Sequence, residues 1–238
     1  MKLKKMLKVI IGIVVFISLP SLLLFGFAYY TYNEEIPEGE TGIEADALAT
    51  KMLETLNYKA FNNVNYLEFS SRNRRHYEWE ISKNICTIYW KDFKVELNLI
   101  NQDSSFTYMH SFKVTGEQNR KLLKKAVSYY NKDTFWLLAP FKVFDEGVER
   151  KIVNTKEYSN ALLVMHPDNH DIPVKTYLWI LDKNGKPTSF KMWDSSLPIN
   201  GLEATWNHWI TTENGVLLPN LHKIFLFGFE LNNIKTTN

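Results

Sequence analysis

The sequence has a single cysteine, Cys86, so no disulfide can form within the chain. It contains no dinucleotide-binding G-x-G-x-x-G loop, no P-loop, no H-E-x-x-H zinc motif and no G-x-S-x-G nucleophile elbow. It also lacks a basic patch with interleaved aromatic residues, the pattern that binds nucleic acid. These absences disfavour nucleotide-dependent enzymes, zinc peptidases and nucleic-acid-binding proteins. Cys86 itself is expected to be a small buried hydrophobe.

Acidic residues are missing from the first 32 positions, which carry four lysines. The rest of the chain has 24 lysines and arginines against 26 acidic residues, a net charge of −2. The basic character of the whole chain therefore comes from its N-terminal segment. No charged residue occurs between Val9 and Tyr32, and about 20 apolar residues suffice to cross the hydrocarbon core of a bilayer.

This segment predicts a transmembrane anchor over residues 9–32, preceded by a basic cytoplasmic N-terminus over residues 1–8. Lysines precede the apolar run and none follows it directly, which leaves the N-terminus in the cytoplasm by the positive-inside rule. A signal peptide cut after Ala28 is the alternative, but the run is longer than a signal core of about 7–15 residues. In either case we expect the remainder on the periplasmic side of the inner membrane.

The remainder is expected to comprise a linker over residues 33–43, one domain over 44–231 and a polar tail over 232–238. Its length suits a single domain with a sizeable core. Aromatic residues make up 14% of the chain, which is typical of a β-rich interior. Apolar residues recur at helical spacing over Ile43–Tyr58 and Glu117–Tyr130, whereas the other apolar segments alternate like strands.

This order predicts an α+β fold. We expect a strongly curved antiparallel sheet, an open half-barrel of about ten strands, with the helices covering its concave side. Short polar turns separate the expected strands, and Asn184-Gly185 is a strong hairpin signal. The expected strands are Tyr66–Ser70, His76–Ile81, Ile85–Trp90, Phe93–Leu99, Val148–Val153, Ala161–Met165, Val174–Leu181, Thr188–Trp193, Ala204–Thr212 and Leu217–Phe227.

The polar clusters of the sequence give little support for catalysis or metal binding. His166 and His170 are four residues apart, but Pro167 places them in a loop, so a solvated turn is favoured over a metal site. Asp145 and Glu146 are adjacent and would point apart in an extended strand, which argues against a pair of acid–base carboxylates. No metal, cofactor or catalytic residue is expected.

Large apolar side chains concentrate around three irregular stretches of the domain. They support two interpretations: a packed core, since aromatic residues dominate β-rich interiors, or a pocket for an apolar ligand, with a few polar groups that fix its orientation. His208 is a candidate for such a polar group, although a lone histidine is more often structural. The candidate pocket residues are Phe135, Trp136, Leu138, Phe141, Phe144, Trp193, Trp206 and Trp209.

The passage Asn131–Lys142, NKDTFWLLAPFK, resembles the bacterial LolA-like proteins, the superfamily of lipoprotein carriers and outer-membrane lipoprotein-sorting proteins. A D-x-G triplet beginning at Asp145 and the segments Tyr177–Asp182 and Gly201–Trp206 fit the same likeness, which extends over about residues 44–230. The resemblance implies a half-open β-barrel whose helices form a lid over an apolar cavity. It also implies that the cavity holds acyl chains of lipoproteins or other lipids.

We therefore expect a non-enzymatic, membrane-anchored periplasmic protein that binds a lipid or the acyl chains of a lipoprotein. Each buried CH₂ group contributes about 0.8 kcal/mol, so an apolar cavity can hold a chain that water rejects. The alternative is a structural or protein-interaction module of the cell envelope with a filled core, and a lipid hydrolase ranks third. The expected helical anchor differs from carriers of this type, which are soluble or are anchored by a lipidated cysteine. The resemblance also assigns no role to Arg72, Arg74 or Arg75.

Overall fold

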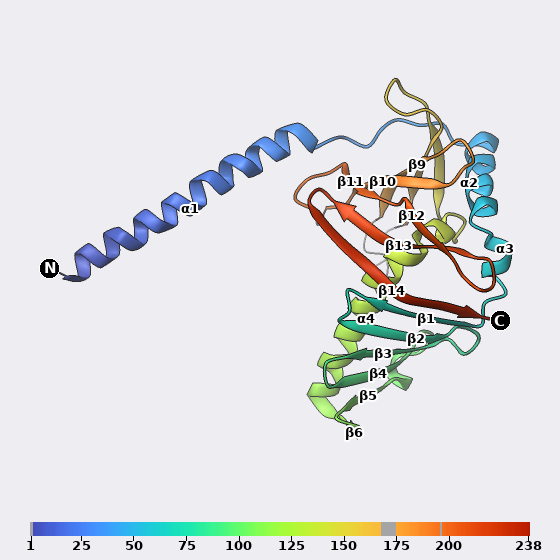
Figure 1. Cartoon of the computed structure of the whole chain (residues 1–238), viewed down its shortest axis with the longest axis horizontal. Coiled ribbons are helices and arrows are strands. Elements are labelled where there is room, and N and C mark those ends of the chain that lie inside the picture. The colour runs from blue at the N-terminus through green and yellow to red at the C-terminus, as the bar shows by residue number, and fades with distance from the viewer. Residues whose placement is uncertain (1, 168–174, 196) are drawn as a thin grey trace.

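The computed structural model describes residues 2–167, 175–195 and 197–238. Its first helix, α1 (Lys2–Tyr32), projects from a β-rich body that holds the rest of the chain (Figure 1). At a rise of about 1.5 Å per residue this helix is roughly 45 Å long. Among the described residues it is the one helix long and apolar enough to span a membrane, a test that an N-terminal signal sequence also passes.

The strands of the described residues form one antiparallel sheet of fourteen. They are β1 (Tyr66–Ser71), β2 (Arg75–Glu80), β3 (Ile85–Trp90), β4 (Phe93–Asn98), β5 (Phe106–Met109), β6 (Phe112–Lys113), β7 (Glu149–Val153), β8 (Ala161–Met165), β9 (Thr176–Leu181), β10 (Pro187–Trp193), β11 (Leu202–Thr205), β12 (His208–Thr211), β13 (Leu217–Ile224) and β14 (Phe227–Thr237). Their spatial order is β6-β5-β4-β3-β2-β1-β14-β13-β11-β10-β9-β8-β7, and β12 pairs with β13. The end strands β6 and β7 do not pair with each other, so the sheet curves without closing into a barrel.

In the described part of the chain three α-helices follow α1: α2 (Ile43–Thr55), α3 (Tyr58–Phe61) and α4 (Gly116–Leu138). The helix expected over Ile43–Tyr58 is divided in two because Asn57 adopts a left-handed conformation with φ of 58°. Short 3₁₀ turns complete the elements. They are η1 (Ile81–Lys83), η2 (Gln102–Ser104) and η3 (Ala139–Lys142).

The helix α4 continues to Leu138, whereas its sequence pattern predicted an end at Tyr130. Its last turns carry Phe135, Leu137 and Leu138, which are all buried in the core, so tertiary packing extends the helix beyond its amphipathic stripe. Pro140, in η3, then ends it, because proline lacks the backbone N–H that a continuing helix requires.

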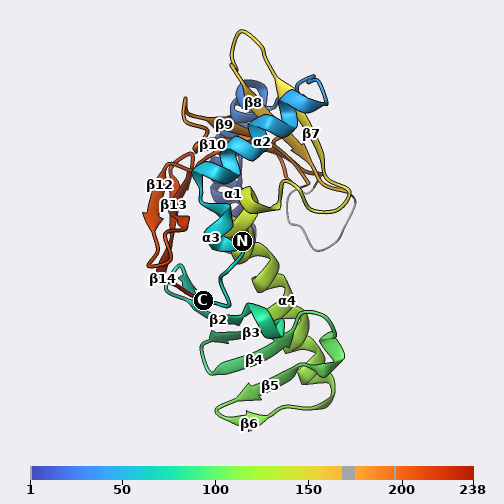
Figure 2. The same ribbon diagram turned by 90° about the vertical axis from the view of Figure 1, so that its right-hand side faces the viewer.

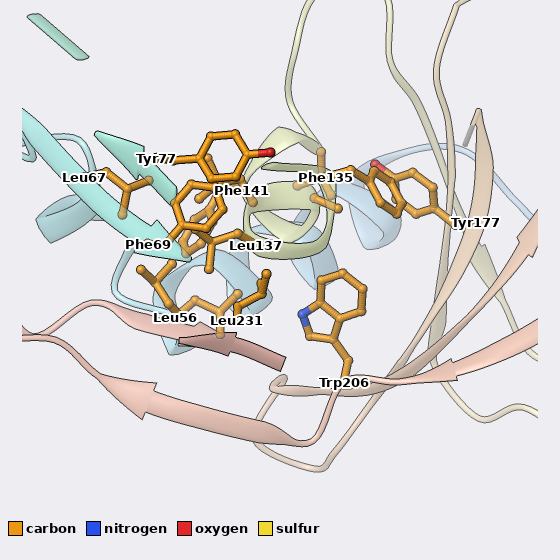
Figure 3. Close-up of a cluster of buried hydrophobic side chains, with 14 of the residues drawn as sticks. Leu56, Leu67, Phe69, Tyr77, Phe135, Leu137, Phe141, Tyr177, Trp206 and Leu231 are labelled. Atoms are coloured by element: carbon orange, nitrogen blue, oxygen red, sulfur yellow. The ribbon is translucent and has the colours of Figure 1, made fainter. Parts of the chain in front are cut away.

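The main core lies between the helices and the concave face of the sheet, and it is continuous across both halves of the sheet (Figure 2). Helix α4 connects the halves: Tyr77 of β2 donates a hydrogen bond to Asp133 of α4, and the Phe135 ring lies 6.0 Å from that of Tyr177 on β9. Figure 3 shows these rings on either side of the helix, with Trp206 beneath them. An open, curved antiparallel sheet with helices on its concave side confirms the predicted α+β fold.

The C-terminal segment differs from the polar tail expected over residues 232–238. It continues β14 to Thr237 and pairs with β1, from Tyr66↔Thr237 to Ser71↔Leu231. A shift in register between Glu68 and Ser70 interrupts this pairing, so the alternation of buried and exposed residues is irregular. Because β14 is the only strand between β1 and β13 in the described sheet, this segment joins its two halves.

The segment expected as a linker is docked on the sheet. Glu40 exchanges two backbone hydrogen bonds with Ile152 of β7, at 2.9 and 2.8 Å. Gly39 approaches the same strand so closely that a Cβ atom at that position would lie 2.9 Å from the Ile152 carbonyl oxygen. These backbone hydrogen bonds lie at the edge of the sheet, since β7 is its end strand. The face of the sheet opposite α4 carries a second, smaller cluster of apolar side chains that includes Trp193.

Candidate functional site at the open end of the sheet

Four of the eight predicted pocket residues are buried in the main core: Phe135, Leu138, Phe141 and Trp206. The Trp206 ring lies 4.9 Å from the Phe190 ring and 5.0 Å from the Trp179 ring, with edge-to-face geometry in both pairs. Ring pairs at these distances stabilise a packed interior. The structure thus places these four residues in a filled core.

Three other predicted residues lie apart from this group. Trp193 is on the opposite face of the sheet, in the smaller cluster. Phe144 is exposed, and the Arg150 guanidinium lies 4.4 Å from its ring centre. Trp209 is partly buried against the main core, and its indole N–H donates to the Pro187 carbonyl at 3.1 Å.

The eighth residue, Trp136, lines a pocket of about 700 Å³ where the β1–β2 turn meets the β13–β14 hairpin. Its ring lies 5.6 Å from that of Trp206 on the interior side and 4.8 Å from that of Phe229 on the pocket side. Trp136 therefore forms the boundary between the filled core and the pocket. We call this pocket the mouth; its other apolar side chains are Leu221, Ile224, Phe227 and Phe229.

The mouth is also lined by charged residues, Arg72 and Arg74 of the β1–β2 turn and Glu230 of β14. The Arg72 guanidinium lies 4.4 Å from the centre of the Phe229 ring. Within the described residues neither arginine has a carboxylate partner, and both are exposed. The formal net charge of the lining is thus +1. Both guanidinium groups are available to bind an anion, and apolar side chains line the base of the mouth.

The hairpin tip beside the mouth exposes three consecutive large apolar residues. Leu226 is 97% exposed and Phe227 is 80% exposed, and Phe225 is also exposed. Scattered single apolar residues are normal on protein surfaces, but a contiguous group commonly marks a site of interaction. This tip therefore has the character of a contact surface.

Behind the mouth, His222 is fully buried among aromatic rings. Its ring centre lies 4.2 Å from that of Trp206 and 5.2 Å from that of Trp136. Its Nδ1 lies 3.2 Å from the Thr205 carbonyl oxygen, and its Nε2 has no hydrogen-bond partner among the described residues. Burial lowers the pKa of His222 to about 4, so the ring is neutral at pH 7.

A buried ion pair fixes the helix that carries Trp136. The Arg75 guanidinium donates two hydrogen bonds to Asp133, from Nε at 2.5 Å and from Nη2 at 3.0 Å. The Tyr77 hydroxyl donates to the same carboxylate, and burial, followed by the Asp133 charge, raises the pKa of Tyr77. A bidentate pair of this type defines geometry as well as contributing energy, so it sets the rotation of α4 against β2.

The described residues of the polar clusters lie in separate environments. His166, expected in a solvated turn, is instead buried, and its Nε2 forms a hydrogen bond with the Tyr177 hydroxyl; His170 lies outside the described residues. Asp145 and Glu146 are both exposed. In the described part of the chain no group of three His, Cys, Asp or Glu side chains is placed to hold a metal ion.

The sequence reasoning found Trp136 but missed the other groups of the mouth. Arg72 and Arg74 had no assigned role, and Phe229 lies beyond the expected end of the last strand. His208 was the histidine singled out, yet it is exposed and His222 is the one beside Trp206. The apolar triplet Phe225–Phe227 is the sequence signal that could have indicated this end of the molecule, but it was included in the expected strand Leu217–Phe227.

No protein-family model matches the chain, and no curated protein sequence matches it. Solved structures that resemble it in shape include a DUF1329 family protein from Desulfovibrio piger, 7% identical, with 82% of this chain and 94% of that chain aligned at a TM-score of 0.43. Another is a domain assigned to outer membrane lipoprotein sorting, from Vibrio parahaemolyticus, 10% identical, with 80% and 94% aligned at a TM-score of 0.34. TM-scores this low carry no argument about function, which rests on the geometry of this chain.

Proposed function

We propose that this chain is a non-enzymatic, membrane-anchored envelope protein that binds an amphipathic lipid, or the acyl chains of a lipoprotein, in the mouth. The observation that carries the proposal is the combination of side chains there. Trp136, Phe227 and Phe229 offer an apolar surface, and Arg72 and Arg74 offer unpaired positive charge at its rim. An acyl chain with an anionic head presents the complementary pattern.

The size of the mouth agrees with such a ligand. Small-molecule pockets typically enclose about 300–1,000 Å³ and are lined mainly by apolar and aromatic side chains. Burial of eight CH₂ groups contributes roughly 6 kcal/mol before the entropic cost of association is subtracted. The two arginines would then orient the head group of the ligand, because guanidinium groups bind phosphate and carboxylate oxygens in a bidentate manner.

The anchor supports the same proposal. Helix α1 has lysines before its apolar stretch and none just after it, and by the positive-inside rule this charge pattern supports a cytoplasmic N-terminus and a periplasmic β-rich domain. Retention of α1 in the inner membrane keeps the mouth close to a supply of lipids and lipoproteins. The docked segment after α1 then holds the domain at a fixed position relative to the helix end.

A binding experiment tests this function. Full-length protein in nanodiscs is titrated with a fluorescent fatty acid, and binding is measured by anisotropy. We expect Trp136→Ala and Arg74→Gln each to weaken binding, whereas Arg120→Gln, an exposed arginine on α4, leaves it unchanged. Equal affinity in all four proteins would contradict binding in the mouth, as would the absence of any binding above that of empty nanodiscs.

A structural or protein-interaction module remains the second candidate, because one observation favours it. The interior beneath the Phe135–Phe141 passage is filled by ring contacts with Trp179, Phe190 and Trp206. A protein of this kind would use the mouth and the hairpin tip as a surface for another protein. The same titration separates the two candidates, since only the first binds the fatty acid.

A further inference from the structure

The hairpin tip lies at the end of α1. Tyr32, the last residue of this helix, packs edge-on against Phe225 with ring centres 5.0 Å apart. Figure 1 shows the β13–β14 turn on the side of the β-rich body that faces α1. The exposed apolar triplet 225–227 is therefore at the level where an anchored helix would leave the bilayer.

The segment after α1 is held against the sheet, so this proximity is fixed. Lys191 of β10, whose side chain is 8% exposed, lies 2.7 Å from the Glu34 carboxylate, and Trp193 Nε1 donates to the Glu34 carbonyl at 2.9 Å. Burial lowers the pKa of Lys191, but its hydrogen bond to the Glu34 carboxylate more than offsets this effect and raises the pKa above its usual value, so the lysine stays charged. The Asn200 backbone N–H donates a further hydrogen bond to the Asn33 side-chain oxygen at 3.0 Å.

The turns beside the tip carry positive charge, although the net charge of the chain after residue 32 is −2. The β1–β2 turn holds Arg72 and Arg74, and the β3–β4 turn holds Lys91 next to Asp92. Antiparallel pairing brings these turns to the same end of the sheet as the β13–β14 tip. Basic side chains near a membrane surface are attracted to anionic lipid phosphates.

We propose that the tip 225–227 inserts into the headgroup region of the bilayer that α1 spans, with Arg72 and Arg74 at the lipid phosphates. The partner is the phospholipid surface itself. Aromatic and apolar side chains partition into this region, and one anchoring helix with a second contact would hold the domain in one orientation. The mouth would then open directly onto the lipid layer. The inference rests on retention of α1 as an anchor and does not require a ligand in the mouth.

The test uses the full chain in vesicles of phosphatidylethanolamine and phosphatidylglycerol. A single polarity-sensitive fluorophore is attached through Leu226→Cys or, as the matched control, through Ile100→Cys. Ile100 is 79% exposed and follows β4 at the opposite end of the strands. The native Cys86 is fully buried, and burial raises the pKa of its thiol, so it contributes little labelling.

We expect the fluorophore at the tip to be blue-shifted and quenched by lipids with a nitroxide near the headgroup, and the fluorophore at the control site to show neither effect. Adding Arg72→Gln and Arg74→Gln should reduce the quenching at the tip. Equal spectra and equal quenching at both sites would overturn the proposal. A tip shielded from lipid-borne and water-soluble quenchers alike would overturn it as well, in favour of a protein partner.

Discussion

The interior and the mouth of this half-barrel are lined by the same kinds of side chain but differ in how these are packed. Trp206 is fully buried, and its ring packs edge-to-face against Phe190 at 4.9 Å and against Trp179 at 5.0 Å. Around Phe227 the apolar surface is open to solvent beside unpaired arginines. Trp136 contacts both regions. The comparison shows that aromatic content alone does not identify a binding site, whereas position relative to the ends of the strands does.

The largest expected effect is on stability in the interior. Trp206→Ala should lower the free energy of unfolding by about 3–5 kcal/mol, because a large cavity replaces a fully buried indole. Chemical denaturation of the full chain in detergent measures it. A loss below about 1 kcal/mol would show that the interior is loose enough to collapse or to admit a ligand, and the contrast with the mouth would disappear.

The next largest effect is a loss of stability at acidic pH, which we expect from the buried His222. Its pKa in the folded protein is about 4, below its ordinary value of 6.5, so between these values the unfolded chain binds a proton that the folded protein excludes. Stability is therefore complete above pH 6.5 and falls as the pH is lowered towards 4. The loss should be about 2–3 kcal/mol at pH 4.5.

Denaturation of the native protein and of His222→Phe at pH 7 and 4.5 tests this assignment. The variant should lose less stability on acidification than the native chain does. Its remaining loss includes that from His166, whose pKa burial also lowers to about 4. An identical loss in both proteins would mean that water reaches the His222 ring and that the wall behind the mouth is open.

A smaller change in the free energy of unfolding is expected at the docked segment that follows α1, residues 33–40. Lys191→Met removes the partner of Glu34 and should cost about 1–2 kcal/mol, a value discounted for the 40% exposure of the Glu34 side chain. It should also speed proteolysis within residues 33–40. Lys235→Met, which breaks the exposed pair with Glu68, is the control and should change neither property. Equal proteolysis of both variants would show that the segment is not held by Lys191.

The smallest effect on stability, and the most specific effect on function, is expected at the mouth. Phe227→Ser should change the free energy of unfolding by less than about 0.5 kcal/mol, since the side chain is already exposed. It should weaken binding of the fluorescent fatty acid about tenfold, because the ring would be buried only in the complex. Phe112→Ser, 78% exposed in the native protein but remote from the mouth, should leave that affinity unchanged.

The fold class could be predicted from the sequence because local hydrophobic patterns indicate the helices and strands. Clean alternation, as in Phe93–Asn98, located the strands that have one face in the core. The pattern failed for β14, where the largely polar segment from Asn232 to Thr237 forms a strand because it pairs with β1. It also failed for residues 33–40, whose docking depends on the distant side chain of Lys191.

The candidate site was only partly predictable for a related reason. The mouth is built from residues 72–74, from Trp136 and from 221–232, three segments that become neighbours only when β14 pairs with β1. Local periodicity in the sequence does not indicate that β14 pairs with β1. Trp193 shows the converse error: it is buried as expected, but β10 is buried along almost its whole length, so the pattern could not assign its side of the sheet.

Photo-crosslinking with a lipid that carries a diazirine in its acyl chain tests the central claim most directly. Membranes containing the full-length protein are irradiated, and the modified residues are identified by mass spectrometry. Binding in the mouth predicts adducts on Trp136 and Phe229, which an annular lipid around α1 does not reach. Adducts confined to α1 and the exposed tip 225–227, with none on Trp136 or Phe229, would contradict the proposed function and leave only membrane contact.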